Sequence, residues 1–512
     1  MKYILSVYCV WIALNMSAQS GFNRSYDLGG HAAAFCSMEL AEDTVVIYGT
    51  IYQTGASAFG LLFARMDTFG NIIDYKIYND SLEDDFTLVS PNSFIRLSNA
   101  SGYAAVGQFF DRDKGYFAKF DNVGNLEIMQ EYADTIYSNN IFNQIIESNG
   151  NFYIGGTDYD WEVNSTNVVI LKINSSGQLI WEKKVQDPSV VNLFGSIIIK
   201  DENEFVISGG TTNKPGVVPL EYTKNTSKIF AIDSLGNLKW EWQTQPSLDE
   251  LGAGPIFHTN DNKWVYHSAR GWYNATYNEI SIQPKMVVRD EQFNLIKQDT
   301  FGVANSPVTV FLNTIPLHNG GWLAVGTNPQ NYATPPLSTE FNALSGWMYK
   351  IDSNVNKVWS RVDTAFWSTQ TGSANYLYDA IELPSGSIIA CGNSRTYEPV
   401  PKDWGWLIKV SADGCVDTLS CAVLPTQSPS LSPWENLRLY PNPAVSELQI
   451  TGVPIGLWER IEVLNISGQS LIQLYHTHDD RLDLRGLENG VYIVRLTRAG
   501  NTVARKVVKK GR

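Results

Sequence analysis

The chain has 512 residues, of which 44% are hydrophobic and only 18% are charged. Its net charge of −14 argues against binding to nucleic acid through the phosphates, because that needs clustered Lys and Arg. The 15 Trp, 25 Tyr and 22 Phe, together with 40 Gly and 21 Pro, favour strands and turns over helices. We therefore expect an all-β protein.

The N-terminal sequence MKYILSVYCVWIALNMSAQS has the features of a secretory signal peptide. It contains one early lysine, an apolar run from Tyr3 to Leu14, and small residues before the exit. This pattern predicts a signal peptide over residues 1–18, cleaved between Ala18 and Gln19. No later stretch offers the roughly 18 uncharged apolar residues that a membrane span needs. We expect an exported, soluble chain.

A turn motif, as in AIDSLGN at 231–237, occurs seven times. Its third residue is Asp67, Asp121, Asn174, Asp233, Asp290, Asp352 or Ser411. Successive copies are 53 to 62 residues apart, and a period of that size indicates a structural repeat. Asp, Asn or Ser at the first position of a type I turn accepts bonds from the backbone ahead, and a glycine three residues later permits a left-handed conformation. Phe293 and Val355 replace that glycine in two copies, for which we expect a different turn geometry.

Each repeat contains four short segments typical of strands. In the second repeat they are SFIRLS, GYAAVGQ, GYFAKFD and NLEIMQEY. Seven such units predict a seven-bladed β-propeller over residues 19–423. The segment 21–30 resembles the last strand of a repeat, so we expect it to pair with the seventh repeat, unless residues 414–421 take that position.

Four cysteines remain after export: Cys36, Cys391, Cys415 and Cys421. Disulfides are permitted outside the cytoplasm, and the three possible pairings of four cysteines stay open. No Cys/His spacing supports a metal site, so we expect no metal and no cofactor.

The C-terminal part begins with a Pro/Ser-rich stretch, which predicts a linker over residues 424–436. Alternating apolar residues after it predict a small Ig-like β-sandwich over residues 437–512. This segment has a net charge of +4, which leaves −18 on the rest of the chain.

The order of several motifs in this segment resembles the type A C-terminal sorting domain of type IX secretion substrates. The matching residues are Tyr440, Pro441, Asn442, Pro443, Gly468, Gly490, Tyr492 and Lys506. The resemblance covers roughly residues 437–510. It implies recognition by the outer-membrane secretion machinery, followed by attachment to surface polysaccharide or release. We therefore expect a protein that is secreted or attached to the outer cell surface.

Catalytic motifs are scarce. The repeated turn differs from a sialidase-type box, because its Asp and Gly are three residues apart and Trp follows in three copies only, at Trp181, Trp240 and Trp359. DRDKG at 111–115 resembles half a calcium loop but lacks the third oxygen ligand and the distant bidentate Glu, so we expect a charged loop tip. Neither HExxH nor GxSxG occurs. These observations predict that the chain is not an enzyme and has no catalytic residues.

Binding is the function that we expect, at aromatic residues in or near the variable connections. These are Trp161, Trp272, Tyr273 and Trp367, and exposed rings of this kind stack on sugar faces. The ligand class is a glycan or a protein, and the fifth repeat, which departs most from the pattern, is the first place to look. Two alternatives stay open: a hydrolase of polysaccharide or peptide with its active site at the propeller axis, and a structural part of a surface assembly. Paired catalytic carboxylates from different repeats would leave no spacing signal.

Overall fold

The computed structural model describes residues 21–52, 59–78, 86–87, 90–109, 113–132, 138–160, 165–185, 190–212, 225–274, 279–302, 309–329, 344–365, 373–396, 402–416, 437–451, 458–465, 469–477, 481–498 and 501–511. The chain divides into two compact units, unit 1 at Met1–Thr426 and unit 2 at Gln427–Arg512. The predicted cleavage site at Ala18 and Gln19 lies outside the described residues. Within them, no helix is long and apolar enough to cross a membrane.

Unit 1 consists of sheets whose strands follow one another in chain order. The first sheet contains β2 (Ala32–Ala41), β3 (Thr44–Tyr52), β4 (Phe59–Asp67) and β5 (Ile72–Tyr78). The second contains β6 (Phe86–Thr87), β7 (Phe94–Arg96), β8 (Gly102–Phe109), β9 (Lys114–Asp121) and β10 (Leu126–Tyr132). The third contains β11 (Ser138–Ser148), β12 (Asn151–Asp160), β13 (Ser165–Asn174) and β14 (Leu179–Val185).

The fourth sheet contains β15 (Val191–Asp201), β16 (Glu204–Thr212), β17 (Thr226–Ile232) and β18 (Leu238–Gln243). The fifth contains β19 (Ile256–His258), β20 (Trp264–Asn274), β21 (Glu279–Arg289) and β22 (Leu295–Thr300). One eight-stranded sheet contains β23 (Val310–Pro316), β24 (Trp322–Pro329), β25 (Leu344–Ile351), β26 (Lys357–Asp363), β27 (Ser373–Glu382), β28 (Ile388–Thr396), β29 (Lys402–Val410) and β1 (Phe22–Tyr26). The all-β expectation is confirmed.

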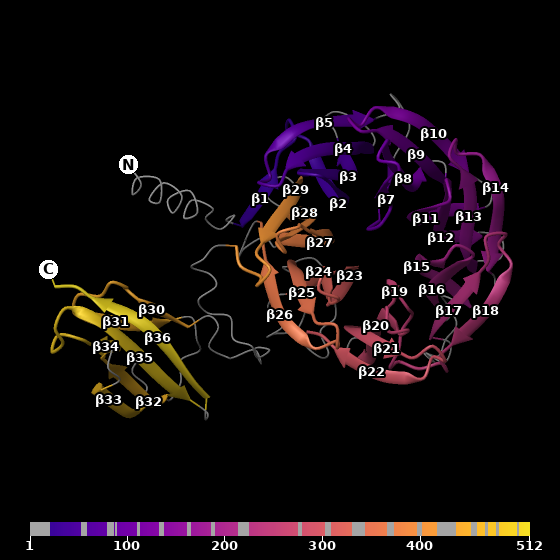
Figure 1. Ribbon diagram of the computed structural model, residues 1–512. Helices are drawn as coiled ribbons and strands as arrows, with labels where there is room; N and C mark the ends of the chain where they lie inside the picture. The colour runs from indigo at the N-terminus through magenta and orange to yellow at the C-terminus, as the bar shows by residue number, and fades with distance from the viewer. Residues whose placement is uncertain are drawn as a thin grey trace, which may run out of the picture. The chain divides into compact units, whose positions relative to one another are not determined.

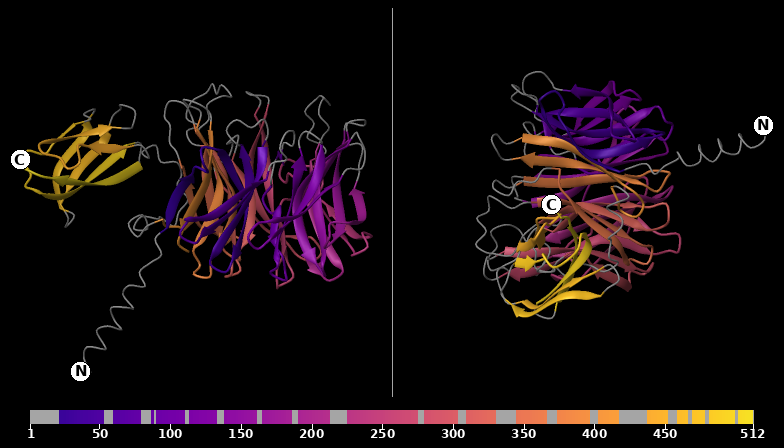
Figure 2. Two further views of the ribbon diagram at one scale, coloured as in Figure 1. Left: turned by 90° about the horizontal axis from the view of Figure 1, so that it is seen from above. Right: turned by 90° about the vertical axis from the view of Figure 1, so that its left-hand side faces the viewer.

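The sheets of unit 1 stand side by side around a common centre, with their earliest strands innermost (Figure 1). Their strands run along the axis of this ring, as the left view of Figure 2 shows. The sixth and seventh repeats share the eight-stranded sheet because one parallel bridge, between Leu344 and Ala374, joins β25 to β27. The N-terminal strand β1 pairs antiparallel with β29, so the expected pairing of this segment with the last repeat is observed.

Each repeated turn connects the last two strands of a repeat. At the first turn, Asp67 Oδ1 accepts bonds from the backbone N–H groups of Phe69 and Asn71, at 2.9 and 2.8 Å, and Asp67 Oδ2 accepts one from the Asn71 side chain at 2.8 Å. The backbone N–H of Gly70, with φ of 79°, donates to the Asp67 carbonyl. The carboxylates of four other copies accept the same set of bonds: Asp121, Asp233, Asp290 and Asp352.

Asn174 and Ser411 occupy the corresponding positions in the remaining two copies. Asn174 Oδ1 accepts bonds from the backbone N–H groups of Ser176 and Gln178, and Ser411 Oγ accepts one from Cys415. A side chain that accepts bonds from the following backbone stabilises the turn locally, before any tertiary contact forms.

The expectation of a different geometry at Phe293 and Val355 is wrong. Both residues take left-handed conformations, with φ of 62° and 58°, and their N–H groups donate to the carbonyls of Asp290 and Asp352. Such a conformation is uncommon for residues with a Cβ, and packing explains it. The Phe293 ring stacks on Trp242 at 4.8 Å and on Trp264 at 5.7 Å, and Val355 is fully buried.

Neighbouring sheets are connected through these turns. The hydroxyl groups of Tyr26, Tyr78 and Tyr132 donate to the turn carbonyls of Gly70, Gly124 and Gly177 in the next repeat. The indole N–H groups of Trp181 and Trp359 likewise donate to the carbonyls of Ser234 and Ala412. The three tyrosines end β1, β5 and β10, so β1 occupies the position of an outermost strand in a repeat.

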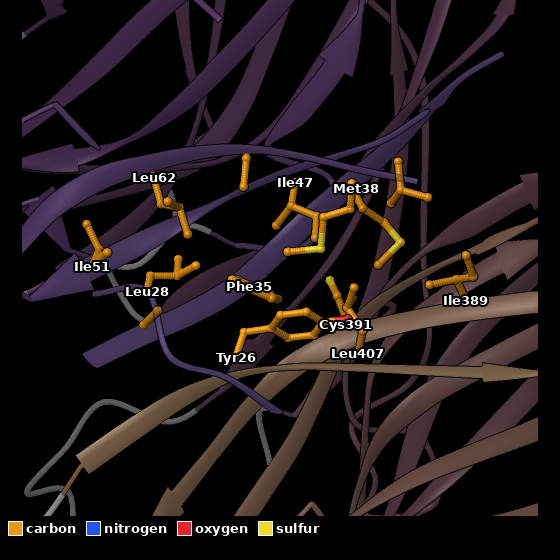
Figure 3. Close-up of a cluster of buried hydrophobic side chains, with 14 of the residues drawn as sticks. Tyr26, Leu28, Phe35, Met38, Ile47, Ile51, Leu62, Ile389, Cys391 and Leu407 are labelled. Carbon is orange, nitrogen blue, oxygen red and sulfur yellow. The ribbon is translucent and has the colours of Figure 1, made fainter. Parts of the chain in front are cut away.

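One buried apolar cluster lies between the first sheet and the eight-stranded sheet (Figure 3). It includes Tyr26, Phe35, Met38, Ile389 and Leu407, which come from β1, β2, β28 and β29. Cys391 belongs to the same cluster, and it and Cys36 are free thiols. Cys415 is disulfide-bonded, whereas Cys421 lies outside the described residues.

Unit 2 contains two sheets. One has β30 (Arg438–Tyr440), β31 (Glu447–Thr451) and β34 (Arg481–Asp483), and the other has β33 (Ser470–Thr477), β32 (Trp458–Leu464), β35 (Gly490–Arg498) and β36 (Asn501–Lys509). Leu448 and Leu482 from the first sheet are buried in one cluster with Ile461 and Val494 from the second. Both sheets therefore contribute to a single core.

Candidate functional site

The innermost strands of the ring carry a belt of buried polar contacts. β11, β15, β23, β27 and β2 each have a register shift, and the residue after it is polar: Gln144, Ser196, Asn313, Asp379 and Ser37. Gln144 Nε2 donates to the Ile197 carbonyl of the next sheet at 3.0 Å, and the Ile256 N–H donates to Ser196 Oγ at 3.1 Å. A bulge redirects one side chain, and here the redirected groups connect neighbouring sheets.

Asp379 is the only carboxylate in this set of five. Its Oδ2 accepts bonds from the Met38 N–H at 2.9 Å and from Ser37 Oγ at 3.2 Å. Its Oδ1 accepts bonds from Asn313 Nδ2 and from the Ala380 N–H, both at 2.8 Å. Burial raises the pKa of Asp379 to about 6, although all four bonds act in the opposite direction. This carboxylate therefore links repeats six, seven and one.

The connection between β6 and β7 contacts distant sheets inside the ring. Asn92 Nδ2 donates to Asn313 Oδ1 at 2.9 Å, and the Asn92 carbonyl accepts a bond from the Ile145 N–H at 3.3 Å. Ser90 Oγ accepts a bond from Asn143 Nδ2 at 3.0 Å. These contacts place residues 90–93 between β11 and β23.

A second carboxyl group and an arginine lie on inner strands, Glu39 on β2 and Arg96 on β7. Burial, helped by the charge of Asp379, raises the pKa of Glu39 to about 8, while the backbone and charge of Arg96 oppose the rise. Arg96 Nε is buried without a hydrogen-bond partner in the described part of the chain. The interior of the ring thus combines two carboxyl groups of raised pKa with a guanidinium group.

A cavity of about 270 Å³, called cavity A below, lies where the first and second sheets meet the eight-stranded sheet. It is at the end of the ring where the inner strands begin, since its lining includes Ala32 and Thr50. Its lining also includes Ala33, Ala34, Cys36, Phe59, Phe86, Tyr378, Asn393, Arg395 and Asp403.

The polar wall of cavity A is held rigidly. Asn393, which is only 6% exposed, donates through Nδ2 to Asp403 Oδ1 at 2.9 Å. Arg395 binds both oxygens of Asp403, at 2.9 and 2.7 Å. Asn393 Oδ1 is buried and has no hydrogen-bond partner among the residues described. Buried polar atoms are nearly always paired, so Asn393 Oδ1 is an unusual acceptor in a residue that lines cavity A.

A second cavity, of about 370 Å³ and called cavity B below, lies in the fifth sheet. Polar side chains line it: Asp249, Arg270, Lys285, Gln298, Asp299 and Thr300. Lys285 is only 3% exposed, which is unusual for a lysine side chain.

Of the four aromatic residues predicted to bind ligand, two lie within the residues that the structure describes. Trp272 and Tyr273 lie on β20, where their backbones pair with Ser281 and Ile280 of β21. Trp161 and Trp367 lie outside the described residues. Among the described residues, no group of three or more His, Cys, Asp or Glu is arranged to hold a metal ion.

Sequence reasoning missed the polar residues of both cavities, although signals for them exist. Thr50 and Asn393 occupy the same polar position, after the glycine near the end of a repeat's second strand, in YGT and CGN. Lys285 directly precedes an apolar run, in PKMVV. A charged residue inside a buried strand needs a partner or a cavity.

The sorting-motif residues lie on or beside two strands of unit 2. Asn442 Nδ2 donates to the Lys506 carbonyl at 3.0 Å, and its Oδ1 accepts a bond from the Val508 N–H at 2.9 Å. Pro441 and Pro443 flank Asn442, and Tyr440, at the end of β30, is 70% exposed. The YPNP segment therefore lies along β36.

Two further motif residues, Gly490 and Tyr492, lie on β35. The Tyr492 hydroxyl donates to the Glu488 carbonyl at 2.7 Å. Gly468 lies outside the described residues.

Residues 438–510 match the family model described as the secretion system C-terminal sorting domain. No curated protein matches the chain. The sequence-based identification of the C-terminal segment is thereby confirmed.

Solved structures similar to this chain include a β-propeller domain. The β-propeller domain of the Trilobed protease from Pyrococcus furiosus is 9% identical, with a TM-score of 0.38, and the match covers 76% of this chain and 94% of that one. Polysaccharide lyase Uly1 is 7% identical, with a TM-score of 0.42 and coverage of 78% and 93%. A puromycin-hydrolysing peptidase of Mycobacterium tuberculosis is 11% identical, with a TM-score of 0.42 and coverage of 83% of this chain. The present chain spans 60% of the length of that peptidase.

The expectation that the chain is not an enzyme requires correction. The similar structures include a lyase and a peptidase, so the absence of a familiar sequence motif was no ground for excluding catalysis. The physical reason is that a ring of repeated sheets supports many unrelated activities, and sites on it combine residues from distant repeats.

A sorting domain of this kind interacts with the secretion machinery and directs the chain to the exterior. The chain is therefore an exported protein with a propeller-like ring of repeated sheets and a type IX secretion sorting domain, and it is secreted or attached to the outer cell surface.

Proposed function

We propose that this exported protein recognises an extracellular glycan and binds one sugar residue in cavity A. The observation that carries the proposal is the unpaired Asn393 Oδ1, buried in the wall of the cavity. A carboxamide oxygen accepts a hydrogen bond from a sugar hydroxyl, and leaving it unpaired costs about 1–3 kcal/mol.

The rest of cavity A has the chemistry of a sugar subsite. Phe59, Phe86 and Tyr378 supply aromatic surface, on which the apolar face of a pyranose packs. The Asp403 carboxylate and the Arg395 guanidinium also line the cavity beside Asn393. Their bidentate pairing fixes both side chains. A single ring is the appropriate size for a cavity of about 270 Å³.

Asn393→Leu tests this site, because leucine has a similar volume and cannot accept a hydrogen bond. We expect binding of the best ligand on a glycan array to weaken about tenfold, equivalent to about 1.4 kcal/mol. Asn192→Leu is the matched control, since Asn192 is also buried but lies outside both cavities. An array profile that Asn393→Leu leaves unchanged while thermal unfolding shows an intact fold would contradict the proposal.

Hydrolysis of a glycan that enters the ring is the second candidate, favoured by Glu39, which lies on the inner strand β2 and does not line cavity A. With its pKa raised to about 8, this carboxyl group is protonated at neutral pH, as a general acid requires. We expect the release of reducing ends to fall as pH rises through about 8, and Glu39→Gln to slow it at least 100-fold. Glu147→Gln, on β11, is the control. Absence of reducing ends from every glycan that binds would rule out this activity.

We infer a finer architecture for the chain as well. A single bridge joins β25 to β27 within the eight-stranded sheet. Apart from this bridge, the sheet consists of two groups of four strands, β23 to β26 and β27 to β29 with β1. This supports a seven-bladed β-propeller over residues 19–423. The signal peptide at 1–18 and the linker at 424–436 are part of the same proposal. The shared core of its two sheets supports an Ig-like sandwich at 437–512. Attachment to surface polysaccharide after export is part of the same proposal.

A further inference from the structure

Cavity B contains a buried ammonium group with an incomplete set of partners. Lys285 Nζ donates to the Asp249 carbonyl at 2.7 Å, and this is its only hydrogen-bond acceptor in the described part of the chain. An ammonium group has three donors and a full charge, and a neutral carbonyl balances neither. Burial lowers the pKa of Lys285, against the attraction of Glu250 and Asp249, as expected of a cation without its own counter-ion.

The carboxylates near Lys285 are already paired with other cations. Asp249 Oδ1 lies 3.1 Å from Arg270 Nε, and Asp299 Oδ1 lies 3.9 Å from Lys357 Nζ. Glu250 is bound by Arg289 at 2.8 Å and by the Tyr266 hydroxyl at 2.6 Å. Two cations line this cavity of about 370 Å³, Arg270 and Lys285. Arg270 has a carboxylate partner, and among the residues that the structure describes Lys285 is the one without a carboxylate partner of its own.

Lys409 shows how a buried lysine is accommodated elsewhere in unit 1. Its Nζ donates to the Thr68 carbonyl at 3.0 Å and lies 5.4 Å from the centre of the Phe69 ring. It lines neither cavity. Lys285 differs because its ammonium group borders a solvent-sized space that a ligand can occupy.

We propose that cavity B is a second binding site, which takes the carboxylate of a sugar acid such as a hexuronate. The Lys285 ammonium pairs with the carboxylate, and Gln298 and Thr300 bond the ring hydroxyls. This site is independent of cavity A, in which Arg395 is paired with Asp403 and whose lining includes three aromatic side chains. The proposal therefore does not depend on glycan binding there.

A sugar acid fits the charges around cavity B better than an acidic peptide does. Asp249 and Asp299 also line the cavity, and the chain outside residues 437–512 has a net charge of −18, so clustered negative charges are repelled. One carboxylate surrounded by neutral hydroxyl groups avoids this repulsion, and the aspartates accept bonds from the hydroxyls.

The test is calorimetric titration of the full-length secreted protein with methyl glucuronide and with the uncharged methyl glucoside. We expect at least tenfold tighter binding of the glucuronide by the wild type, loss of this preference in Lys285→Met, and its retention in Lys409→Met. Methionine preserves most of the lysine volume, so the two variants differ only in which ammonium is lost. Asn393→Leu should leave the preference unchanged, which separates this proposal from the one on cavity A.

Three results would overturn the inference. The first is equal affinity of the wild type for the two glycosides, a measurement that needs no variant and holds even if Lys285→Met fails to fold. The second is a glucuronide preference that survives in a folded Lys285→Met protein. The third is a glutamate-rich peptide that binds tighter than the glucuronide and depends on Lys285.

Discussion

Asp379→Ala is expected to lower the free energy of unfolding of unit 1 by about 3 kcal/mol or more. The substitution leaves the N–H groups of Met38 and Ala380 and the side chains of Ser37 and Asn313 without their acceptor. Ser37 and Asn313 are almost fully buried, and each buried donor left unsatisfied costs about 1–3 kcal/mol.

Asp379→Asn is expected to be nearly as harmful, although it preserves the shape of the side chain. Backbone N–H groups approach both oxygens, so an amide nitrogen faces a donor in either orientation. Urea unfolding followed by tryptophan fluorescence measures the effect. Asp43→Ala, at an exposed turn, is the control and should change stability by less than about 0.5 kcal/mol. A near-neutral Asp379→Asn would show that the belt does not stabilise the ring.

The contribution of Asp379 also depends on pH. Its folded-state pKa of about 6 lies above the unfolded value, so the folded protein binds a proton that the unfolded chain does not bind between pH 4 and 6. Protonation of this group therefore stabilises the fold as pH falls through 6, and the contribution is complete below about pH 4. The difference in stability between wild type and Asp379→Ala should accordingly be larger at pH 4 than at pH 7.

Tyr26→Ala is expected to lower the free energy of unfolding by about 3–5 kcal/mol, the usual cost of removing a large buried ring. Tyr26 packs against Phe35 at 5.7 Å in the cluster of Figure 3, and its hydroxyl donates to the Gly70 carbonyl at 2.7 Å. Because β1 precedes the whole ring and pairs with β29 at its end, loss of this anchor exposes the edge of β29.

Two variants separate the parts of this effect. Tyr26→Phe removes only the hydroxyl and should cost about 1 kcal/mol. Tyr75→Ala, at a tyrosine on β5 that is 38% exposed, should cost far less than Tyr26→Ala. Limited proteolysis gives an independent readout, since Tyr26→Ala should admit cleavage near β29 before the rest of unit 1 unfolds. Equal resistance of Tyr26→Ala and wild type would contradict a closing role for β1.

Local patterns made much of the fold predictable. The Asp-x-x-Gly-Asn turns are stabilised by hydrogen bonds between the Asp side chain and the backbone that follows it, so each copy predicts a turn between two strands. The YPNP segment and the residues after it likewise predicted the sorting domain that the family match confirms. The turns at Phe293 and Val355 were mispredicted because their strain is offset by packing against residues of other strands. Local propensity contains no information about such contacts.

The candidate sites were not predictable in the same way. Cavity A combines residues separated by more than 350 positions, Ala32 and Asp403 among them, and cavity B combines four segments of the fifth repeat and the connection before it. Whether Asn393 Oδ1 has a partner, or Lys285 a counter-ion, depends on distances between side chains that no spacing along the chain encodes.

The sequence alone determined the repeat, its strands and the export route, because turns, strand patterns and sorting motifs are properties of contiguous residues. Only the tertiary structure decided that β1 pairs with β29, that Asp379 joins three repeats, and that two cavities hold an unpaired acceptor and an unpaired cation. The physical reason is that burial, which raises or lowers the energy of every polar group, arises only when distant segments pack together.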